Sequence, residues 1–420
     1  MKILIRSPQD PLKIYDAYES TKKIGGNSGN LLYINSVARA LYAKNNKLSF
    51  GGFKAHVSNN RKSWAESINE KYEHYVMPLS NAFRSGMTES LIGFTEIVRN
   101  LDIPVTVVGI GAQATALSAK SGTYSMARTG KGDVKSPDAR SDHDRVVYEF
   151  CSAVLEKSRS IGVRGAYTRD YLLSLGLPEE RVRIIGCPSL FTWGPSHRIV
   201  DRDGKDYSGK RWEFHPSMKI SMNIDYRVPG IERMIYKNFQ IYENLFSPSQ
   251  DSMSARMILD NKQYYDISKV NLGAPVHKKH GMFVLGRLLY YPNPWGWIDD
   301  LSTYDFVFGT RLHGNIAGIL GGTPAHLIAH DSRTIELANY HGIPYTEYDS
   351  DSDFLAEDMF RDTSYEKFND LMEDRFNVFL DFLRENNLST AYDEPDAGVD
   401  FDDKIAASRR IGPIYSNGMN

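Results

Sequence analysis

The stretch YDFVFGTRLHGNIAGILGGTPAHLIA, from Tyr304 to Ala329, decides the fold class. Its first five residues are an aromatic and β-branched run, which is typical of a buried strand. Gly309 and Thr310 form a turn with Thr310 as the expected N-cap, and apolar residues then recur at helical spacing. A Gly-Gly pair ends the helix, and a second apolar run follows. The stretch therefore predicts a βαβ unit.

Two side chains of this unit predict an anion site. Ligands of βαβ units bind at the carboxyl ends of the strands, where Arg311 and His313 lie. The first helical turn offers free backbone N–H groups, and a guanidinium suits phosphate or carboxylate. Cationic side chains there oppose the helix dipole by about 0.3–1 kcal/mol each, a cost that is easier to understand if an anion binds. The alternative is structural: Arg311 bridges to a carboxylate and His313 caps the helix.

The same alternation of strands and helices runs along most of the chain, and it predicts parallel, doubly wound sheets. Arg164 repeats the placing of Arg311, where a strand gives way to a helix. A structural ion pair is its alternative role. Two glycine-rich turns, at 25–30 and 109–113, supply further candidates for acceptor or phosphate contacts, with loop capping as the alternative. These candidates are Asn27, Gly29, Asn30, Gly111 and Gln113.

Composition excludes several classes of protein. The chain has 420 residues, of which 41% are hydrophobic and 24% charged, so it is long enough for two domains. A formal net charge of -2 gives no broad basic surface for nucleic acid. The two cysteines, Cys151 and Cys187, predict neither a disulfide framework nor a metal site. No apolar stretch approaches the roughly 20 residues of a membrane span, and the first residues predict a strand rather than a signal peptide.

The chain divides by composition into five parts. We expect a Rossmann-like domain at 1–195, a polar linker at 196–217, a second Rossmann-like domain at 218–345, helices at 346–393, and an acidic, disordered tail at 394–420. The Gly- and Ser-rich segment 119–142 predicts a loop inside the first domain, either functional or a simple insertion.

With these features the sequence resembles the polysaccharide pyruvyl transferase family. The resemblance rests on GGNSGN at 25–30, IGVRGAYTRDYLLSLG at 161–176, VRIIGCPSLF at 182–191 and the long stretch 304–344, which contains Arg-Leu-His-Gly and ends Gly-Ile-Pro. One departure concerns the run of glycines that many members carry after an early strand. This chain has VMPLSNAFRSG there, at 76–86, which removes the basis for expecting a backbone phosphate contact.

The resemblance implies a GT-B-like fold, in which two Rossmann-like domains face a cleft, with the N-terminal domain on the acceptor side. It implies phosphoenolpyruvate as the donor, transfer of pyruvate to two hydroxyls of one sugar as a cyclic ketal, release of phosphate, and no cofactor or metal. Carried onto this sequence, it assigns donor binding to Arg311, Arg164, Leu312 and Gly314. His313 is then the catalytic acid or a phosphate partner.

Two alternatives stay open. One is a GT-B-type glycosyltransferase that uses a nucleotide sugar, although the helix after Arg311 lacks the usual acidic residues. The other is a non-catalytic protein that binds carbohydrate or phosphate. The acceptor sugar, its hydroxyls and the general base are not determined. We expect a cytoplasmic protein of exopolysaccharide synthesis, placed at the inner face of the membrane if its acceptor is lipid-linked.

Overall fold

The computed structural model describes residues 1–113, 141–266, 273–396 and 398–418. The loop predicted at 119–142 thus lies outside the described residues, except for its last two positions. These begin helix α6 (Asp142–Leu155), whose N-cap Ser141 accepts a hydrogen bond from the backbone N–H of Asp144.

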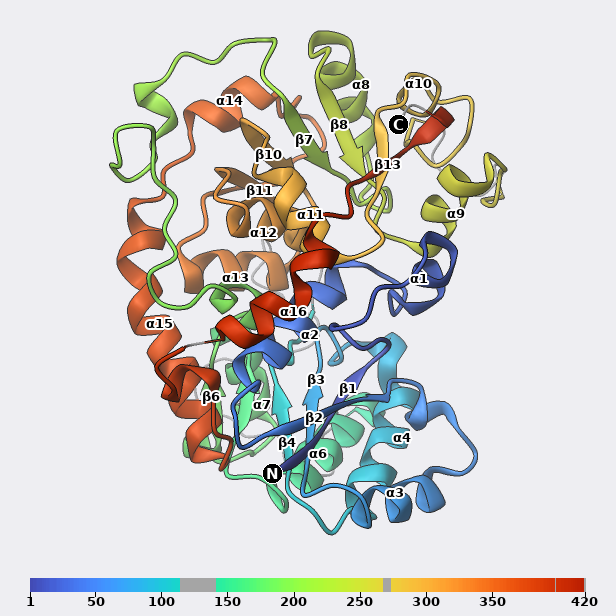
Figure 1. The fold of residues 1–420 in the computed structure, drawn as a ribbon, viewed down its shortest axis with the longest axis vertical. Helices are drawn as coiled ribbons and strands as arrows, with labels where there is room; N and C mark the ends of the chain where they lie inside the picture. The colour runs from blue at the N-terminus through green and yellow to red at the C-terminus, as the bar shows by residue number, and fades with distance from the viewer. Residues whose placement is uncertain (114–140, 267–272, 397, 419–420) are drawn as a thin grey trace.

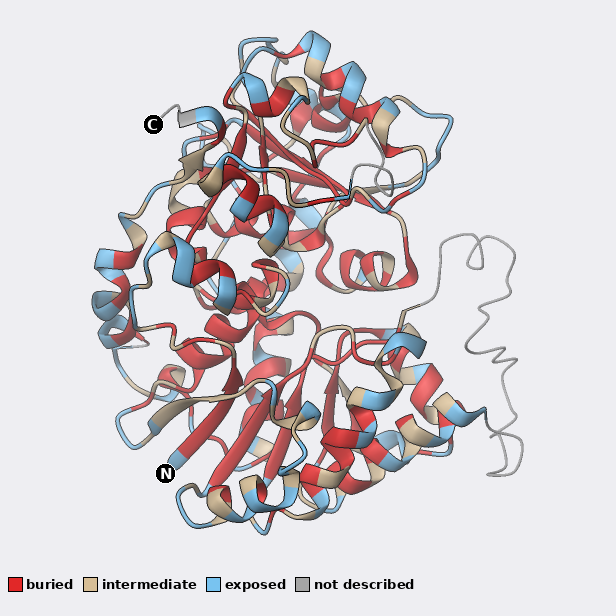
Figure 2. Ribbon diagram, turned by 90° about the vertical axis from the view of Figure 1, so that its right-hand side faces the viewer, coloured by how far each residue is buried: buried red, intermediate tan, exposed pale blue. Residues whose placement is uncertain are grey.

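The N-terminal half is built on a parallel sheet. Its strand order is β2-β1-β3-β4, with β1 at Lys2–Ser7, β2 at Lys47–Gly52, β3 at His74–Pro78 and β4 at Val105–Val108. A parallel pair, β5 (Ile161–Val163) and β6 (Val182–Ile184), continues it through a bridge between Ile110 and Val163. The inner strands β1, β3, β4 and β5 are largely apolar and buried, as both faces of a parallel sheet are covered, whereas the edge strand β2 is only partly buried (Figure 2).

Helices cover this sheet on both faces. They are α1 (Ala17–Lys23), α2 (Gly29–Ala40), α3 (Arg61–Asn69), α4 (Thr88–Arg99), α6 and α7 (Ala166–Ser174). Helices α1 and α2 leave the first sheet and approach the second domain. The Thr21 carbonyl accepts from the Ser252 hydroxyl at 2.9 Å, and the Ser28 backbone N–H donates to the Gln250 carbonyl at 2.8 Å.

The C-terminal half holds a seven-stranded sheet with the order β12-β11-β10-β7-β8-β9-β13. Its strands are β7 (Ile220–Asn223), β8 (Leu245–Pro248), β9 (Leu288–Tyr290), β10 (Phe306–Gly309), β11 (Ala325–Ala329), β12 (Tyr345–Glu347) and β13 (Ile414–Tyr415). All pairs are parallel except that of β13 with β9. The predicted class, two Rossmann-like α/β domains in a GT-B-like arrangement, is confirmed (Figure 1).

The expectation of a disordered tail needs correction. Residues Val399–Arg409 form helix α16, and β13 then closes one edge of the second sheet. The acidic residues of this segment have partners, since Arg39 donates to both carboxylate oxygens of Asp402, at 2.8 and 2.6 Å. Phe401 is fully buried. An acidic composition therefore did not prevent order, because charge pairing and apolar burial hold the segment to both domains.

The remaining helices belong to the second half or bridge back to the first. They are α8 (Ile231–Ile241), α9 (Ser252–Asp260), α10 (Gly281–Val284), α11 (Pro294–Leu301), α12 (Leu312–Leu320), α13 (Ser332–His341), α14 (Ala356–Arg361) and α15 (Glu366–Glu385). Helix α15 runs along one side of both domains (Figure 1). At its end Asn386 accepts from the backbone N–H of Arg159 at 3.0 Å.

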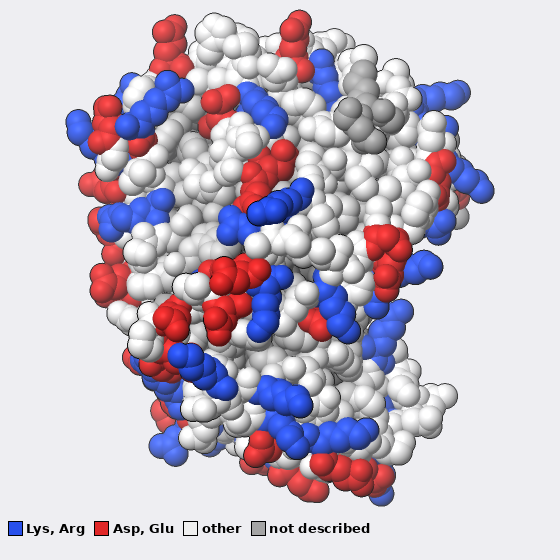
Figure 3. Space-filling view, viewed as in Figure 1, with Lys and Arg blue, Asp and Glu red and all other residues white. Residues whose placement is uncertain are grey.

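The surface carries both signs of charge. Figure 3 shows lysine and arginine interspersed with aspartate and glutamate on one face, as a net charge of -2 leads one to expect. Within the described part of the chain, no helix combines the length and apolar composition needed to cross a membrane.

Candidate functional site

The turn between β10 and α12 sets the position of Arg311. Gly309 has a φ of +134°, and a Cβ there would lie 2.1 Å from the carbonyl oxygen of Asn223, so only glycine fits. The predicted N-cap was wrong by one residue, because Arg311 occupies that position. Thr310 is fully buried, and its hydroxyl accepts instead from the backbone N–H of Asp225 at 2.9 Å. The turn thus ties β10 to β7 and directs the Arg311 side chain toward the cleft.

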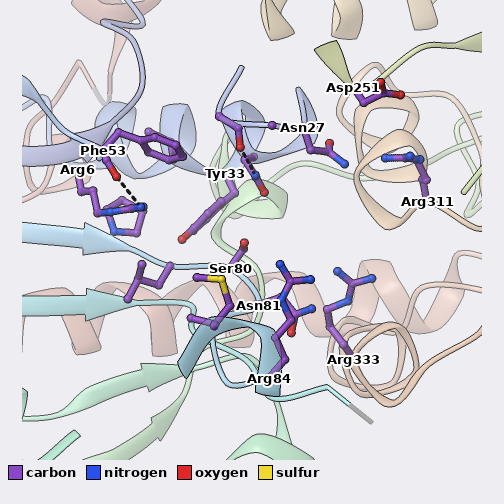
Figure 4. A pocket seen from close by; sticks show the side chains of 18 of the residues that line it. Arg6, Asn27, Tyr33, Phe53, Ser80, Asn81, Arg84, Asp251, Arg311 and Arg333 are labelled. Atoms are coloured by element: carbon purple, nitrogen blue, oxygen red, sulfur yellow. Dashed lines mark hydrogen bonds between the residues drawn. The ribbon is translucent and has the colours of Figure 1, made fainter. Parts of the chain in front are cut away.

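A cavity of about 420 Å³ lies between the two domains at the carboxyl ends of their strands. This volume is in the range of small-molecule sites, and the position is where doubly wound sheets bind ligands. Among the described residues, its polar wall contains five arginines from five different strand ends or strand-helix turns, and one acidic residue, Asp251 (Figure 4). The arginines are Arg6, Arg84, Arg227, Arg311 and Arg333.

Arg84, Arg311 and Arg333 converge at one end of this cavity, which we call the arginine cluster (Figure 4). Burial lowers the pKa of Arg84, and the like charges of Arg333 and Arg227 lower it further. Positive charges that disfavour one another across a cavity stabilise a bound anion. The cluster is therefore arranged to bind a small ligand with several negative charges.

Arg311 is held at the wall by the second domain. Its Nε donates to the carbonyl of Ile224 at 2.6 Å. Burial opposes ionisation of the neighbouring Asp225, yet the hydrogen bonds from Arg227 and the charge of Arg311 hold the pKa of that carboxyl well below its usual range. Asp225 is bound by both Nε and Nη2 of Arg227, at 2.8 and 2.7 Å. Asp225 therefore forms its side-chain hydrogen bonds with Arg227, and the part of the Arg311 guanidinium beyond Nε is left to face the cavity.

Arg333 stands in the first turn of α13, as Arg311 stands at the start of α12. Its Nη2 donates to Asp331 at 3.2 Å, while its Nε is buried without a hydrogen-bond partner. Asp331 caps α13 and also accepts from the Gln113 amide at 2.9 Å. Two helix N-termini, each with an arginine, therefore meet the same cavity, and each adds partly positive N–H groups.

A second layer lies behind the cavity wall. Arg164 is fully buried, its Nε donates to the Gly109 carbonyl at 2.7 Å, and both Nη atoms lack partners. Its guanidinium carbon is 5.5 Å from the ring centroid of Tyr33, which does line the cavity. The His313 ring lies nearly parallel to Tyr33 at 6.5 Å, and its Nε2 is 3.8 Å from the Cys187 sulfur.

This second layer keeps His313 neutral. Burial and the charges of Arg164 and Arg333 hold the pKa of His313 well below its usual range. Its ring faces α2, where a Cβ on Gly29 would lie 2.6 Å from the His313 Cβ. Residues two apart on a helix point to different sides. Arg311 consequently lines the cavity, whereas His313 does not.

The structure separates the other predicted site residues into two groups. Asn27 and Asn30 line the cavity with Arg311, and contact of these residues with a ligand stays a prediction. Behind the wall, Gln113 holds Asp331, and Gly111 packs against Arg164, whose Cδ would be 3.0 Å from an added Cβ. Leu312 is buried, and a Cβ on Gly314 would lie 2.0 Å from the Asn223 amide oxygen. Direct ligand contact by these four residues stays a prediction, and their observed contacts are structural.

Sequence reasoning missed Arg6, Arg84, Arg227 and Arg333. Each follows or ends a strand of the two sheets, at β1, β3, β7 and β11. The same rule that selected Arg311, a cation where a strand gives way to a turn, would have found them. The segment 76–86 contributes Arg84 and the Ser80–Asn81 turn to the cavity. Among the described residues, no group of three or more His, Cys, Asp or Glu side chains is placed to hold a metal.

Comparison with solved structures finds distant likenesses. The Anabaena HepE protein in complex with UDP gives a TM-score of 0.39 at 9% identity, over 97% of this chain and 100% of that one. The Methanocaldococcus jannaschii UDP-GlcNAc 2-epimerase gives 0.43 at 8% identity, over 97% and 100%. Staphylococcus aureus MnaA with UDP gives 0.40 at 10% identity, over 97% of each chain. No functional argument rests on likenesses this low.

Comparison at the level of sequence is more informative. A search of curated proteins finds no match. A family model described as polysaccharide pyruvyl transferase, however, matches residues 27–332. That range contains the glycine turn at 25–30 in large part, Arg84, Arg164, and the complete β10-α12 unit with Arg311 and His313. Because the match covers most of the chain, this protein belongs to the polysaccharide pyruvyl transferase family.

Proposed function

We propose that this transferase moves pyruvate from phosphoenolpyruvate onto two hydroxyls of a sugar, in a polysaccharide or its precursor, and releases phosphate. The observation that carries the proposal is the arginine cluster at the strand ends of both domains. Phosphoenolpyruvate is small and has a phosphate and a carboxylate on adjacent atoms. It therefore needs several guanidinium groups close together rather than a pocket for a base and ribose.

The reaction requires one proton transfer, two additions and one bond cleavage at the donor. The methylene carbon gains a proton, and the neighbouring carbon then carries positive character. One sugar hydroxyl adds to that carbon, the bond from this carbon to the phosphate oxygen breaks, and the second hydroxyl closes the ketal ring. Two hydroxyl protons are lost and one is gained by carbon, so the other leaves with phosphate or a base. Arg84, Arg311 and Arg333 stabilise the departing phosphate, whose negative charge increases as the bond breaks.

His313 is our candidate for the acid or for a partner of the phosphate, a role that requires its ring to come forward from behind the cavity wall when the donor binds. In the free protein it is neutral because burial, Arg164 and Arg333 lower its pKa. A bound donor with several negative charges would raise that pKa again, so the ring would be protonated mainly in the loaded enzyme. A pH profile of kcat should then have a limb near the usual histidine range, and His313→Gln should remove it. A His313→Gln enzyme with the wild-type rate would exclude this role.

The donor is tested by isothermal titration of the protein with phosphoenolpyruvate, UDP-glucose and GDP-mannose. We expect saturable binding of phosphoenolpyruvate alone, and its loss in Arg311→Ala. Arg233, an exposed residue paired with Asp353, gives the control variant Arg233→Ala, which should bind as the wild type does. Binding of a nucleotide sugar with phosphoenolpyruvate inert would instead identify a glycosyltransferase. Binding of phosphoenolpyruvate without phosphate release across a panel of sugar acceptors would favour a non-catalytic protein.

A further inference from the structure

The end of the cavity away from the arginine cluster holds a second cation, Arg6, at the carboxyl end of β1 (Figure 4). Arg6 is only 7% exposed. Among the described residues, the hydrogen bond of its guanidinium is that of Nη2 to the Phe53 carbonyl, at 2.9 Å, and its Nε is enclosed without a partner. The guanidinium thus lines the cavity with only Nη2 engaged by the described part of the chain.

Arg6 also lacks a counter-ion among the described residues. The groups that act on its charge are Tyr75 and Tyr33, both neutral near pH 7, and burial lowers the pKa of Arg6. The guanidinium lies over the rings of Phe53 and Phe94, at 4.4 and 4.9 Å from their centroids. These rings stabilise a cation only partly. A buried charge without an opposite charge is destabilising, so an anion from outside the chain would complete this site.

The wall beside Arg6 has the polar groups that a sugar needs. The hydroxyl of Tyr33 is buried and has no hydrogen-bond partner in the described part of the chain, and Asn30 lines the same cavity. Asn27 lies farther along, on the side of Tyr33 toward Arg311 (Figure 4). Amide and hydroxyl groups are suited to sugar hydroxyls, which both donate and accept. This wall belongs to the N-terminal domain, the side expected for the acceptor.

Arg6 lies apart from the arginine cluster. The like charges that lower the pKa of Arg84 are those of Arg333 and Arg227 rather than that of Arg6. Figure 4 likewise places Arg6 and Phe53 at the opposite end from Arg84, Arg311 and Arg333, with Tyr33 between them. The cavity therefore offers two anion sites, and a donor held by the cluster leaves Arg6 for the second substrate.

We propose that Arg6 and Tyr33 form an anion subsite for the acceptor, so that the accepting sugar carries a negative charge of its own, as a carboxylate or a phosphate. This inference rests on the proposed function, because it treats the cluster as the donor site. It narrows the acceptor from any sugar with two suitable hydroxyls to an acidic or phosphate-bearing one.

The test measures binding of three probes, glucuronate, glucose 1-phosphate and glucose, by ligand-observed NMR and isothermal titration. The proteins are the wild type, Arg6→Met and the matched cavity variant Arg333→Met. We expect the wild type to bind at least one anionic probe about tenfold more tightly than glucose. Arg6→Met should remove that preference and change the Kd for phosphoenolpyruvate less than about threefold. Arg333→Met should instead keep the preference for the anionic probe and raise the Kd for phosphoenolpyruvate by more than about threefold. Preference for glucuronate identifies a carboxylate, and preference for glucose 1-phosphate a phosphate.

Folding is controlled in two ways. Met fills similar space without the unpaired charge, so the ligand-free Tm of Arg6→Met should equal or exceed that of the wild type. Tyr33→Phe removes only an unbonded hydroxyl, and it should weaken the anionic probe while keeping the Tm. The inference is overturned if Arg6→Met weakens phosphoenolpyruvate as much as Arg333→Met does, or if glucose binds as tightly as the anionic probes. A wild type that does not bind phosphoenolpyruvate would refute the proposed donor, while the Arg6 dependence of the anionic probes would still decide this subsite.

Discussion

Replacement of Arg311 by alanine tests the donor site most directly. Arg311 occupies the N-cap position of α12 and lines the cavity. Among the described residues, the hydrogen bond that holds its side chain is that of Nε to the Ile224 carbonyl, at 2.6 Å. The variant removes the guanidinium but leaves α12 intact, since the Arg311 side chain makes no capping hydrogen bond. We therefore expect a folded protein whose change is confined to the cavity.

The magnitude follows from what the guanidinium does there. Removing one partner of a partly buried, charge-assisted pair costs about 2–4 kcal/mol, within the range seen when a bound charge loses its partner. That corresponds to a Kd for phosphoenolpyruvate raised about 30- to 700-fold. Arg311→Lys keeps the charge but loses the planar fork, so it should fall between the wild type and the alanine variant.

Isothermal titration with phosphoenolpyruvate at constant ionic strength gives the comparison, with Arg233→Ala as the exposed control. Circular dichroism and Tm establish that each variant is folded. An Arg311→Ala protein that is folded and binds phosphoenolpyruvate with the wild-type Kd would refute the assignment of the cluster to the donor. If Arg311→Lys loses as much affinity for phosphoenolpyruvate as Arg311→Ala does, the planar guanidinium rather than its charge is what the donor requires.

Three further predictions concern stability. Gly314→Ala should lower the free energy of unfolding by about 1–3 kcal/mol, because its Cβ would lie 2.0 Å from the Asn223 amide oxygen; Gly412→Ala, where a Cβ would meet nothing within 4 Å, is the neutral control in urea unfolding. Glu336 is buried against the Thr168 hydroxyl at 2.8 Å, and burial raises the pKa of Glu336 from 4.5 to about 7. The preference of the folded state for the protonated carboxyl stabilises the fold fully below pH 4.5, and this stabilisation is lost as pH rises through 7. The free energy of unfolding of Glu336→Gln, relative to that of the wild type, should therefore be about 2–3 kcal/mol higher at pH 8 than at pH 4. Equal differences at both pH values would contradict this prediction. Burial lowers the pKa of His326 from 6.5 to about 4, a stabilisation present above pH 6.5 and lost as pH falls to 4. The unfolding free energy should then decline by about 1.4 kcal/mol per pH unit for this residue below pH 6.5, and His326→Gln should flatten that slope in urea titrations at pH 6.5 and 4.5.

The sequence determined the fold class because hydrophobic periodicity is local. Strand, turn and helix were readable in Tyr304–Ala329, including the turn at Gly309 and Thr310. The sequence also identified the family, because its motifs follow one another in one order along the chain. The order of the acidic tail was not predicted, because the contacts that fix it are not local. Its order depends on Arg39 and on the edge of β9, both remote in sequence.

The candidate site shows the same division between local and distant information. Arg311 was identifiable because it stands at a strand end that also begins a helix, and the structure places it on the cavity wall. Arg164 has the same local setting, yet its guanidinium turns inward to the Gly109 carbonyl. His313 is only two residues from Arg311, but helical geometry directs it toward Tyr33 instead. Side-chain direction at equivalent sequence positions was decided by what packs on each side.

What the sequence determined by itself is the α/β class, the two-domain organisation and the position of Arg311 at a strand end. Only the tertiary structure decided which cations meet it. Arg84, Arg311 and Arg333 come from three different strand ends on two sheets, and neither Arg84 nor Arg333 stands out in its own segment. Their convergence depends on the strand order and on the packing of one domain against the other. Coulombic interaction depends on distance in space, so a site made by mutual repulsion of distant residues is not visible until the chain is folded.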